Sequence, residues 1–533
     1  MTTLILTPAM PLHGDVERDD ATWVGLLDAA ALPDAGTLVL AEGERFARAR
    51  LLVRDDAGVR GYVTLPLSGE TLPGDDVRAA VAALPAAAGW QMGADAPPVT
   101  IVVCTRDRAG MLRETLDSLA AVEWGALEVV IVDNAPSTAE TSELVHGEYP
   151  DFRYVREDAP GLSHARNAGL RAATSPIVAF TDDDVIVDPQ WIAQLVAGFG
   201  AADDVDCVTG AVPSGELRNR VQAYFDARVS WSKLIAPRLF RLSDPPPDLP
   251  MFPFCVGEFG TGANFAVRRD AMLALGAFDT ALGAGTGTKG GEDLDMFLRM
   301  LYSGSAIAVN PAAIVWHRHR SDLDALSAQA VGYGRGFGAW ATTVMLEPAM
   351  LGAAMRRAPR AVGRLLRKPM ATVDADGPHV ATASDRAVSR LELSSVLSGP
   401  TSYLRERRRQ LDAGAFAGPA SRGAPLERRL WAALAAVAGI LGLLAALPLP
   451  TWLSLILLAC FVFVGPGAVV RAWVPLPPHL TPVAVPALGL SAVILLVTAS
   501  VFATWWQPAL GLAAIALATC VGALVTYRTG VRA

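Results

Sequence analysis

The sequence predicts an α/β protein: a central domain with a Rossmann-like, mostly parallel sheet, a small β-containing domain before it, and a four-helix transmembrane region after it. Three observations support this. The chain has 533 residues, too many for one ordinary domain. From Val99 onward, strand-like apolar runs alternate with helical spacing. Beyond Leu430 come four long apolar stretches, and none of them contains an acidic or basic residue.

Residues 1–89 are expected to form a small accessory domain. Residues 48–53 and 61–66 read as two strands on either side of Asp55–Gly58, a turn sequence that tolerates positive φ, and so predict a β-hairpin. Residues 90–98 contain glycine and proline and predict a linker into the next domain.

The domain predicted over residues 99–345 begins with strands at 99–104, 127–132, 152–155 and 176–180, with a helix at 112–119. Strands alternating with helices of this length favour right-handed crossovers and a parallel sheet. In open sheets of this kind the ligand binds beyond the carboxyl ends of the strands. Residues that directly follow each strand are therefore the first candidates for function.

Polar residues stand at three of these strand ends. The residues Thr105, Arg106, Asp107 and Arg108 end the first strand, Asp133 ends the second, and the run Asp182–Asp184 follows the fourth. Three successive carboxylates repel one another unless they hold a cation, and hard oxygen ligands suit Mg²⁺ or Mn²⁺. The alternative is a solvated acidic loop or a cap for the next helix, and for Asp133 a turn residue.

Two further segments suit an anionic ligand. Residues 161–169 start a helix whose backbone N–H groups and Arg166 can face an anion. Residues 260–266, with Gly262 and Asn264, allow the backbone to approach a ligand closely.

A glycine-rich stretch over residues 283–291 leads into Glu292 and Asp293 at the start of a helix. A mobile loop that delivers two carboxylates to a site suggests a gate that carries a general base. The alternative is that the helix dipole simply favours acids in the first turn. Trp316 and His317 then follow an apolar strand, and the histidine stands where a metal ligand could lie.

In this order the motifs resemble the family 2 glycosyltransferases, which have the GT-A fold and use nucleotide-activated sugars. The resemblance runs from about Val99 to Arg320 and rests on VVCTRDR, VDNAPS, GLSHARNAG, FTDDDV, GTGANFAVRR, GGEDLD and VWHRHR. It implies a nucleotide-sugar donor and a divalent cation. One departure is Arg106, where many members carry an aromatic residue beside the base.

The resemblance also implies a role for each matching residue. Asp293, preceded by Glu292, would be the catalytic base. Donor-binding residues would be Thr105, Arg106, Asp107, Asp133, Arg166 and Asp183. Asp182, Asp184 and His317 would hold the metal, although which of the three acids touches the cation stays open. Gly262, Asn264 and Trp316 would contact the acceptor or the phosphates.

The four spans are predicted at about 430–447, 452–470, 483–504 and 509–527, within a region at 429–528. The nearby arginines precede the first span, lie in the second loop, or follow the last span, so the positive-inside rule places them in the cytoplasm. We therefore expect a multi-pass protein of the cytoplasmic (inner) membrane, with the catalytic domain and both termini cytoplasmic.

Two segments connect the domains. Residues 346–370 have the make-up of a basic amphipathic helix lying on anionic lipid, the alternative being a solvated surface helix. Residues 371–428 predict a linker with one short helix near 403–411.

The sequence thus predicts a metal-dependent, inverting glycosyltransferase that moves a sugar to a hydroxyl of a glycan or lipid-linked acceptor at the cytoplasmic membrane face, in cell-envelope glycan assembly. One alternative is a processive polysaccharide synthase, but its Gln-x-x-Arg-Trp element does not follow His319. Others are a nucleotidyltransferase, or a non-enzymatic membrane scaffold with a nucleotide-binding domain. The net charge of −8 gives no support for a nucleic-acid partner.

Overall fold

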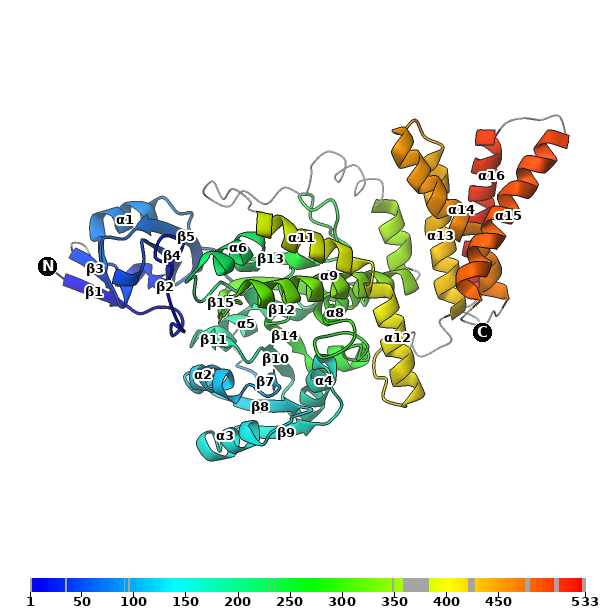
Figure 1. Ribbon diagram of the computed structural model, residues 1–533. Coiled ribbons are helices and arrows are strands. Elements are labelled where there is room, and N and C mark those ends of the chain that lie inside the picture. The colour runs from blue at the N-terminus through cyan, green and yellow to red at the C-terminus, as the bar shows by residue number, and fades with distance from the viewer. Residues whose placement is uncertain are drawn as a thin grey trace. The chain divides into compact units, whose positions relative to one another are not determined.

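The computed structural model describes residues 2–33, 36–90, 92–93, 96–229, 231–233, 235–347, 349–357, 383–419, 427–474, 480–502 and 508–529. These residues divide into two compact units (Figure 1). One holds residues 1–342 and 357–419, and the other holds residues 343–356 and 420–533.

A nine-stranded sheet forms the centre of the first unit, in the order β11-β15-β12-β14-β10-β7-β8-β9, with β13 paired to β15. Its strands are β7 (Val99–Thr105), β8 (Leu127–Asn134), β9 (Arg153–Glu157), β10 (Ile177–Thr181), β11 (Val185–Val187), β12 (Val205–Ala211), β13 (Arg238–Phe240), β14 (Asn264–Arg268) and β15 (Ala306–His317). The accompanying helices are α2 (Ala109–Ala120), α3 (Glu140–Glu148), α4 (Leu162–Ala172), α5 (Trp191–Phe199), α6 (Arg220–Arg228), α7 (Arg269–Ala274), α8 (Glu292–Tyr302) and α9 (Leu323–Leu346).

The sheet is mixed, so the prediction of a mostly parallel sheet is wrong for half of it. The four predicted strands, β7 to β10, are parallel neighbours as expected. Beyond them β14 runs antiparallel to both β10 and β12, and β11 and β13 run antiparallel to β15. An apolar run indicates a buried strand but carries no information on its direction, which explains the error.

Strand register brings the predicted site residues to one edge. Thr105 at the end of β7 is opposite Asp133 at the end of β8. Thr181 at the end of β10 is opposite Val103 on one side and Asn264 on the other. The acidic run therefore begins beside the tips of β7 and β8.

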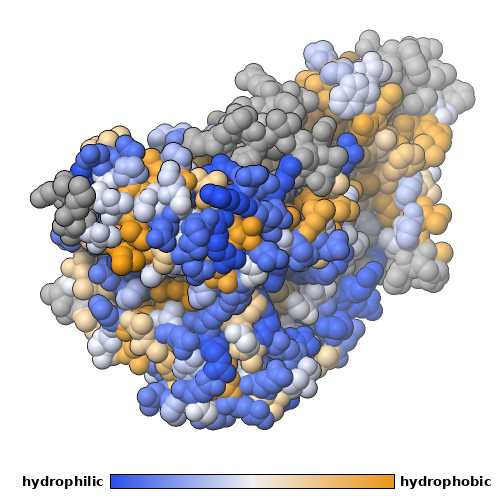
Figure 2. Space-filling model, turned by 60° about the vertical axis from the view of Figure 1, so that its left-hand side comes forward, coloured by the Kyte–Doolittle hydropathy of each residue, from blue (hydrophilic) through white to orange (hydrophobic). Residues whose placement is uncertain are grey.

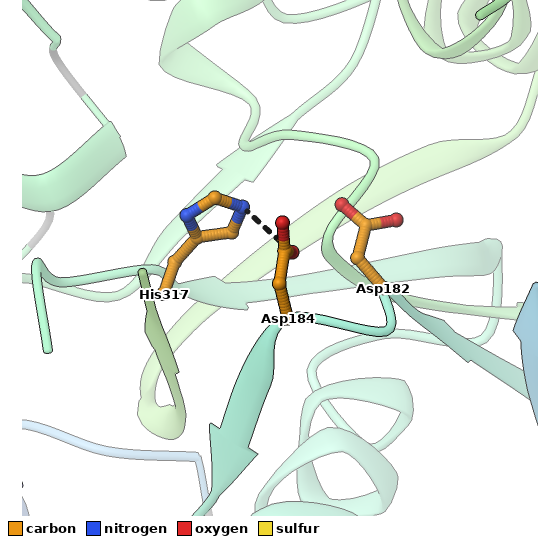
Figure 3. Close-up of side chains that lie close together, drawn as sticks. All are labelled: Asp182, Asp184 and His317. Carbon is orange, nitrogen blue, oxygen red and sulfur yellow. Dashed lines mark ion pairs between the residues drawn. The ribbon is translucent and has the colours of Figure 1, made fainter. Parts of the chain in front are cut away.

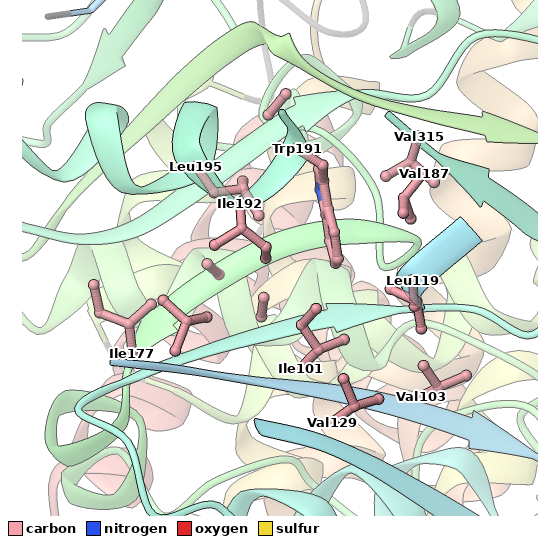
Figure 4. Packing of buried hydrophobic residues seen from close by; sticks show 14 of the residues in the cluster. Ile101, Val103, Leu119, Val129, Ile177, Val187, Trp191, Ile192, Leu195 and Val315 are labelled. Carbon is pink, nitrogen blue, oxygen red and sulfur yellow. The ribbon is translucent and has the colours of Figure 1, made fainter. Parts of the chain in front are cut away.

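Apolar side chains from both halves of the sheet pack around Trp191 of α5 (Figure 4). Its ring is fully buried with Ile101, Val187 and Val315, and its indole N–H donates to the Asn264 Oδ1 at 2.8 Å. Truncating a buried tryptophan to alanine typically costs about 3–5 kcal/mol. This packing fixes the sheet from which the site residues project.

The N-terminal residues fold as two small sheets with one helix. The first sheet contains β1 (Thr2–Leu6), β3 (Gly36–Leu40) and β6 (Thr71–Pro73), and the second contains β2 (Trp23–Asp28), β4 (Arg48–Asp55) and β5 (Gly58–Pro66). The expected hairpin is confirmed, because β4 and β5 pair antiparallel. With α1 (Gly74–Ala82) these strands enclose a separate apolar core.

Within the described part of the segment predicted as a linker at 371–428, residues 383–419, two helices are found where one was expected, α11 (Ala383–Val396) and α12 (Gly399–Asp412), and both belong to the first unit. Val388 of α11 is buried, and the hydroxyl of Tyr403 on α12 donates to the Asp279 Oδ2 at 2.8 Å. The sequence of this segment is rich in alanine and serine, which favoured the prediction of a linker although its apolar residues recur at helical spacing. Residues 358–382 lie outside the described residues, and with them much of the predicted basic helix; residues 349–357 are helical.

The second unit contains α13 (Glu427–Ala445), α14 (Thr451–Trp473), α15 (Thr481–Phe502) and α16 (Pro508–Thr529). Among the residues that the structure describes, three helices are long and apolar enough to span a membrane, at 428–445, 451–473 and 510–527. The fourth predicted span has a shorter described apolar stretch, Thr481–Leu495, so the count of four stays a prediction. Apolar residues gather on the surface of these helices (Figure 2).

Candidate active site

Asp182, Asp184 and His317 come together at the edge of the sheet (Figure 3). Asp182 and Asp184 lie in the turn between β10 and β11, and β11 pairs with the end of β15 so that Val185 is opposite His317. The potential ligand atoms of the three side chains all lie within 4.8 Å of one another. The Asp184 Oδ1 is 3.3 Å from the His317 Nε2. Two carboxylates and an imidazole at this spacing suit a divalent cation such as Mn²⁺.

Burial affects the protonation of these three groups. Burial raises the pKa of Asp182 to about 6, although Arg166 opposes the shift. Burial would also raise the pKa of Asp184, but the attraction of His317 and Arg108 outweighs it and lowers that pKa. Burial lowers the pKa of His317, which favours the neutral imidazole. A deprotonated carboxylate and a neutral imidazole are the forms that bind metals.

Asp183 is buried and is not one of the three potential metal ligands. Its Oδ2 accepts from the Thr105 hydroxyl at 2.7 Å, and its Oδ1 accepts from the Arg108 guanidinium at 2.5 Å. The same guanidinium donates to the Asp184 Oδ2 at 2.8 Å. Arg108 therefore ties Asp183 to Asp184 and holds the Asp184 carboxylate by the oxygen that does not face His317. Thr105 and Asp183 are thus linked to Asp184 through Arg108, and their predicted role in donor binding stays a prediction.

Asp133 is completely buried at the end of β8. Its Oδ2 accepts from the Tyr154 hydroxyl at 2.9 Å, whereas its Oδ1 has no hydrogen-bond partner among the described residues. Burial raises the pKa of Asp133. An unpartnered buried carboxylate oxygen is costly unless a ligand donates to it. Arg106 and Asp107, by contrast, are exposed after the neighbouring strand β7.

Arg166 of α4 links the acidic cluster to the residues after the glycine-rich loop. Its buried guanidinium donates to the Glu292 Oε1 and to the carbonyl of Gly262, both at 2.9 Å, and lies 3.5 Å from the Asp182 Oδ1. The Glu292 Oε2 is buried without a hydrogen-bond partner among the described residues. Burial, with Asp293 adding to it, raises the pKa of Glu292.

Asp293 lies in the first turn of α8. Its Oδ2 accepts from the backbone N–H of Gly262 at 2.9 Å, and its Oδ1 accepts from the N–H of Leu294 at 2.8 Å. Gly291 just before the helix has a φ of 92°, which lets the loop turn sharply into it. Gly262 thus joins the two candidate groups, since its N–H binds Asp293 and its carbonyl binds Arg166.

One cavity of about 600 Å³ opens onto these groups. Arg166, Asp182, Glu292 and Asp293 line one part of it, and side chains of α6, α9 and α11 line the rest. Its volume lies in the range of small-molecule binding sites.

The family described as "Glycosyl transferase family 2" matches residues 100–275, which include the ends of β7, β8 and β10 with the whole acidic run. This segment is a family 2 glycosyltransferase domain. The succinoglycan biosynthesis protein ExoM of Rhizobium meliloti is 35% identical over 226 residues, which are 41% of this chain and 65% of that protein.

Two more proteins are similar to this chain. The pre-mycofactocin glycosyltransferase of Mycobacterium tuberculosis is 27% identical over 44% of this chain and 46% of that protein. The chain thus spans less than two thirds of the length of this relative and of ExoM. A solved structure of the mannosyltransferase PcManGT from Pyrobaculum calidifontis, in complex with GDP-Man and Mn²⁺, is 18% identical over 72% of this chain and 90% of that one. Its TM-score of 0.34 is too low to bear on this chain.

Two residues predicted to contact the acceptor or the phosphates, Asn264 and Trp316, are buried in the structure. Asn264 is completely buried, and both polar atoms of its side chain are hydrogen-bonded within the protein, to the Trp191 indole and to the carbonyls of Ala211 and Ala313. Trp316 is 4% exposed and packs against the N-terminal residues Met10 and Leu52. Successive side chains of a strand point to opposite faces, so Trp316 cannot share one site with His317.

The sequence places Arg108 at the end of the first predicted strand without assigning it a role, and it gives no indication of Tyr154. Arg108 directly follows the predicted residue Asp107, and a basic side chain among so many carboxylates is a signal that could have revealed it. Tyr154 lies on β9, and its contact with Asp133 depends on the pairing of β9 with β8, which no local pattern predicts.

Proposed function

We propose that this chain is a membrane-anchored glycosyltransferase of the GT-A type that transfers a sugar from a nucleotide-sugar donor to a hydroxyl, with inversion and with a divalent cation. The observation that supports this most strongly is the Asp182–Asp184–His317 cluster beside the cavity that also contains Asp293. Metal ligands next to a separate carboxylate are what an inverting transfer requires.

The donor half of the site would lie over the ends of β7, β8 and β10. The free Oδ1 of Asp133 would accept a hydrogen bond from the nucleobase or ribose. Asp182, Asp184 and His317 would hold Mn²⁺ or Mg²⁺, which when bound supplies Lewis-acid stabilisation of the diphosphate leaving group. Arg108 would keep the Asp184 carboxylate in place for that cation.

The acceptor half would lie at Asp293. An acceptor hydroxyl must lose its proton as its oxygen attacks the anomeric carbon, and a carboxylate facing the cavity can take that proton. The Gly262 N–H holds the Asp293 Oδ2, while Arg166 and Glu292 keep the loop end in position. Attack from the side opposite the leaving group inverts the anomeric carbon.

The apolar helices of the second unit support a membrane anchor. With the arginine placement, they favour a catalytic domain at the cytoplasmic face of the inner membrane, where a glycan or lipid-linked acceptor of the cell envelope would meet it.

Substitution of the proposed base tests this function. We expect Asp293→Asn to lower sugar transfer by at least about a hundredfold, because general-base catalysis typically contributes 10²–10⁴-fold. The full chain in lipid nanodiscs would be given a panel of nucleotide-sugars with Mn²⁺, and nucleoside diphosphate release would be measured beside donor binding. The control is Asp270→Asn, because Asp270 is exposed. Asp295→Asn would be unsuitable, because Asp295 accepts a hydrogen bond from Arg299 within helix α8. Full turnover by Asp293→Asn would remove Asp293 as the base.

A further inference from the structure

The cavity has an apolar half that the proposed reaction does not use. Beyond Glu292 and Asp293 its wall is mainly aromatic and aliphatic, with Phe225 of α6, Leu326, Tyr333 and Phe337 of α9, and Val388 and Leu393 of α11, although Arg228, Ser389 and Glu392 also line it. Three of them are large apolar side chains that remain well exposed although they line a cavity. Tyr333 is 42% exposed, Phe337 46% and Leu393 58%.

The wall that α11 provides is firmly attached. Glu392 accepts from Arg228 of α6 at 2.5 Å, and Val388 packs with Phe225 and Ala330. Two glycines of α9 let α11 approach closely. A Cβ on Gly334 would lie 2.1 Å from the carbonyl oxygen of Glu392, and one on Gly338 would lie 2.1 Å from that of Val396.

The two halves of the cavity differ in charge. Arg166 pairs with Asp182 and Glu292 and binds the carbonyl of Gly262, whose N–H binds Asp293, so these four charged groups lie together. In the other half, Arg228 and Glu392 form an ion pair with each other. An occupant that matches this pattern has a polar end at the carboxylates and an apolar end between α9 and α11.

We propose that the apolar half is the acceptor subsite and that the acceptor is amphipathic, with its reacting hydroxyl at Asp293 and an apolar aglycone between α9 and α11. This rests on the proposed function and specifies its acceptor class. Exposed apolar side chains in a cavity gain free energy when an apolar group covers them, at about 25 cal/mol per Å² of buried surface. A purely polar glycan would leave Tyr333, Phe337 and Leu393 uncovered.

A photolabelling experiment tests the subsite without requiring turnover. The full chain in lipid nanodiscs is labelled with an octyl β-glucoside that carries a diazirine at the end of its chain, and the labelled peptides are mapped. We expect labels on α9 between Leu326 and Phe337 and on α11 between Val388 and Val396. Excess octyl β-glucoside should compete, and methyl β-glucoside should not. Labels confined to the helices of the second unit would overturn the proposal.

Two leucines of α11 provide a matched pair. Leu393 lines the cavity, whereas Leu391, 44% exposed on the same helix, is not part of its wall. We expect Leu393→Ser to raise the octyl glucoside concentration needed for half competition about tenfold, and Leu391→Ser to leave it unchanged. Phe337→Ser should act like Leu393→Ser. Equal effects of Leu391→Ser and Leu393→Ser would overturn the assignment.

Measuring nucleoside diphosphate release distinguishes a failure of the apolar acceptor subsite from a failure of the proposed glycosyltransferase function. Slow nucleoside diphosphate release without acceptor should be the same in wild type, Leu391→Ser and Leu393→Ser, because neither leucine touches the donor half. Octyl glucoside should change that release at a concentration at least about tenfold lower than methyl glucoside does. No release from wild type with any donor would refute the glycosyltransferase proposal, whereas release that responds equally to both glucosides would refute only the apolar subsite.

Discussion

At the scale of single residues, Arg108 has the largest unexpected role. Its guanidinium binds Asp183 and Asp184 at once, so it compensates the charge of the acidic run and fixes one carboxylate of the candidate metal cluster. Partners that orient a metal ligand in this way usually matter to metal affinity almost as much as the ligands do.

Removing Arg108 should therefore weaken metal binding. We expect Arg108→Ala to raise the Mn²⁺ concentration for half-saturation about 10–100-fold, since Asp184 loses the donor on its Oδ2. Electron paramagnetic resonance of free Mn²⁺ measures this directly. Arg113→Ala on the neighbouring helix α2 is the control, because Arg113 is exposed and pairs with Glu148. Identical Mn²⁺ curves for Arg108→Ala and wild type would contradict the role.

His319 makes stability depend on pH. Its Nε2 bonds the Ser214 hydroxyl at 2.8 Å, and burial, reinforced by His317, lowers its pKa from 6.5 to about 3. Between these values the unfolded chain binds a proton that the folded chain does not. The stability that the folded chain gains from keeping His319 neutral is therefore complete above pH 6.5 and is lost as the pH falls toward 3.

We expect the melting temperature of His319→Gln to depend less on pH than that of the wild type. The melting temperature of wild type should fall between about pH 7.5 and 5.5, and that of the variant should fall less, because glutamine keeps a polar partner for Ser214 but does not titrate there. His146→Gln, at an exposed position, is the control. Parallel curves for wild type and His319→Gln, measured by thermal unfolding in detergent, would contradict the prediction.

At the scale of elements, the sequence predicted strands and site residues best where an apolar run ends directly at polar residues. The strands β7 to β10 and the residues at their tips follow from apolar runs that stop at polar residues. The burial of Trp316 and Asn264 could not be predicted, because a sequence motif does not show which face of a strand each of its residues occupies. Trp316 is covered by Met10, from the far N-terminal part of the chain, and no local pattern reveals such a contact.

The glycines of helix α9 are explained by tertiary packing, which local sequence patterns do not reveal. Its sequence Gly332 to Gly338 alternates glycine with larger residues, which by itself disfavours a helix. The glycines are explained by packing. A Cβ on Gly336 would lie 2.8 Å from the carbonyl carbon of Gly290, whereas one on Gly332 would meet nothing nearer than 3.7 Å.

These two glycines predict opposite effects of the same substitution. Gly336→Ala should push the loop at 283–291 away and misplace Asp293, lowering turnover at least about tenfold and also the melting temperature. Gly332→Ala should preserve turnover and add about 0.5–1 kcal/mol of stability, because alanine favours a helix more than glycine does. Turnover and thermal unfolding of both variants provide the check. If both variants kept wild-type turnover and stability, the position of the loop at 283–291 would not depend on its contact with α9.

At the scale of the whole molecule, the first unit is held together by contacts between segments that are distant in the chain. Arg50 and Arg54 of the N-terminal strands bind Asp226 and Asp188 of the catalytic part at 2.7 and 2.8 Å. From the other end of this unit, Gln410 of α12 donates to the carbonyl of Thr280, just before the glycine-rich loop. Segments on both sides of the glycosyltransferase domain thus brace the part of the chain that carries the candidate site.

The arginines that flank the apolar helices of the second unit predict its membrane topology. Arginines before α13, at Arg471 near the end of α14, and after α16 predict that these ends face the cytoplasm, and that residues 448–450 face the opposite side. In a variant whose five native cysteines are replaced, Leu449→Cys should react with a membrane-impermeant maleimide added to intact spheroplasts. Leu480→Cys, in the loop after Arg471, is the matched position and should react only after lysis. Labelling of Leu480→Cys in intact spheroplasts would place the catalytic domain on the outer face and exclude a cytoplasmic donor.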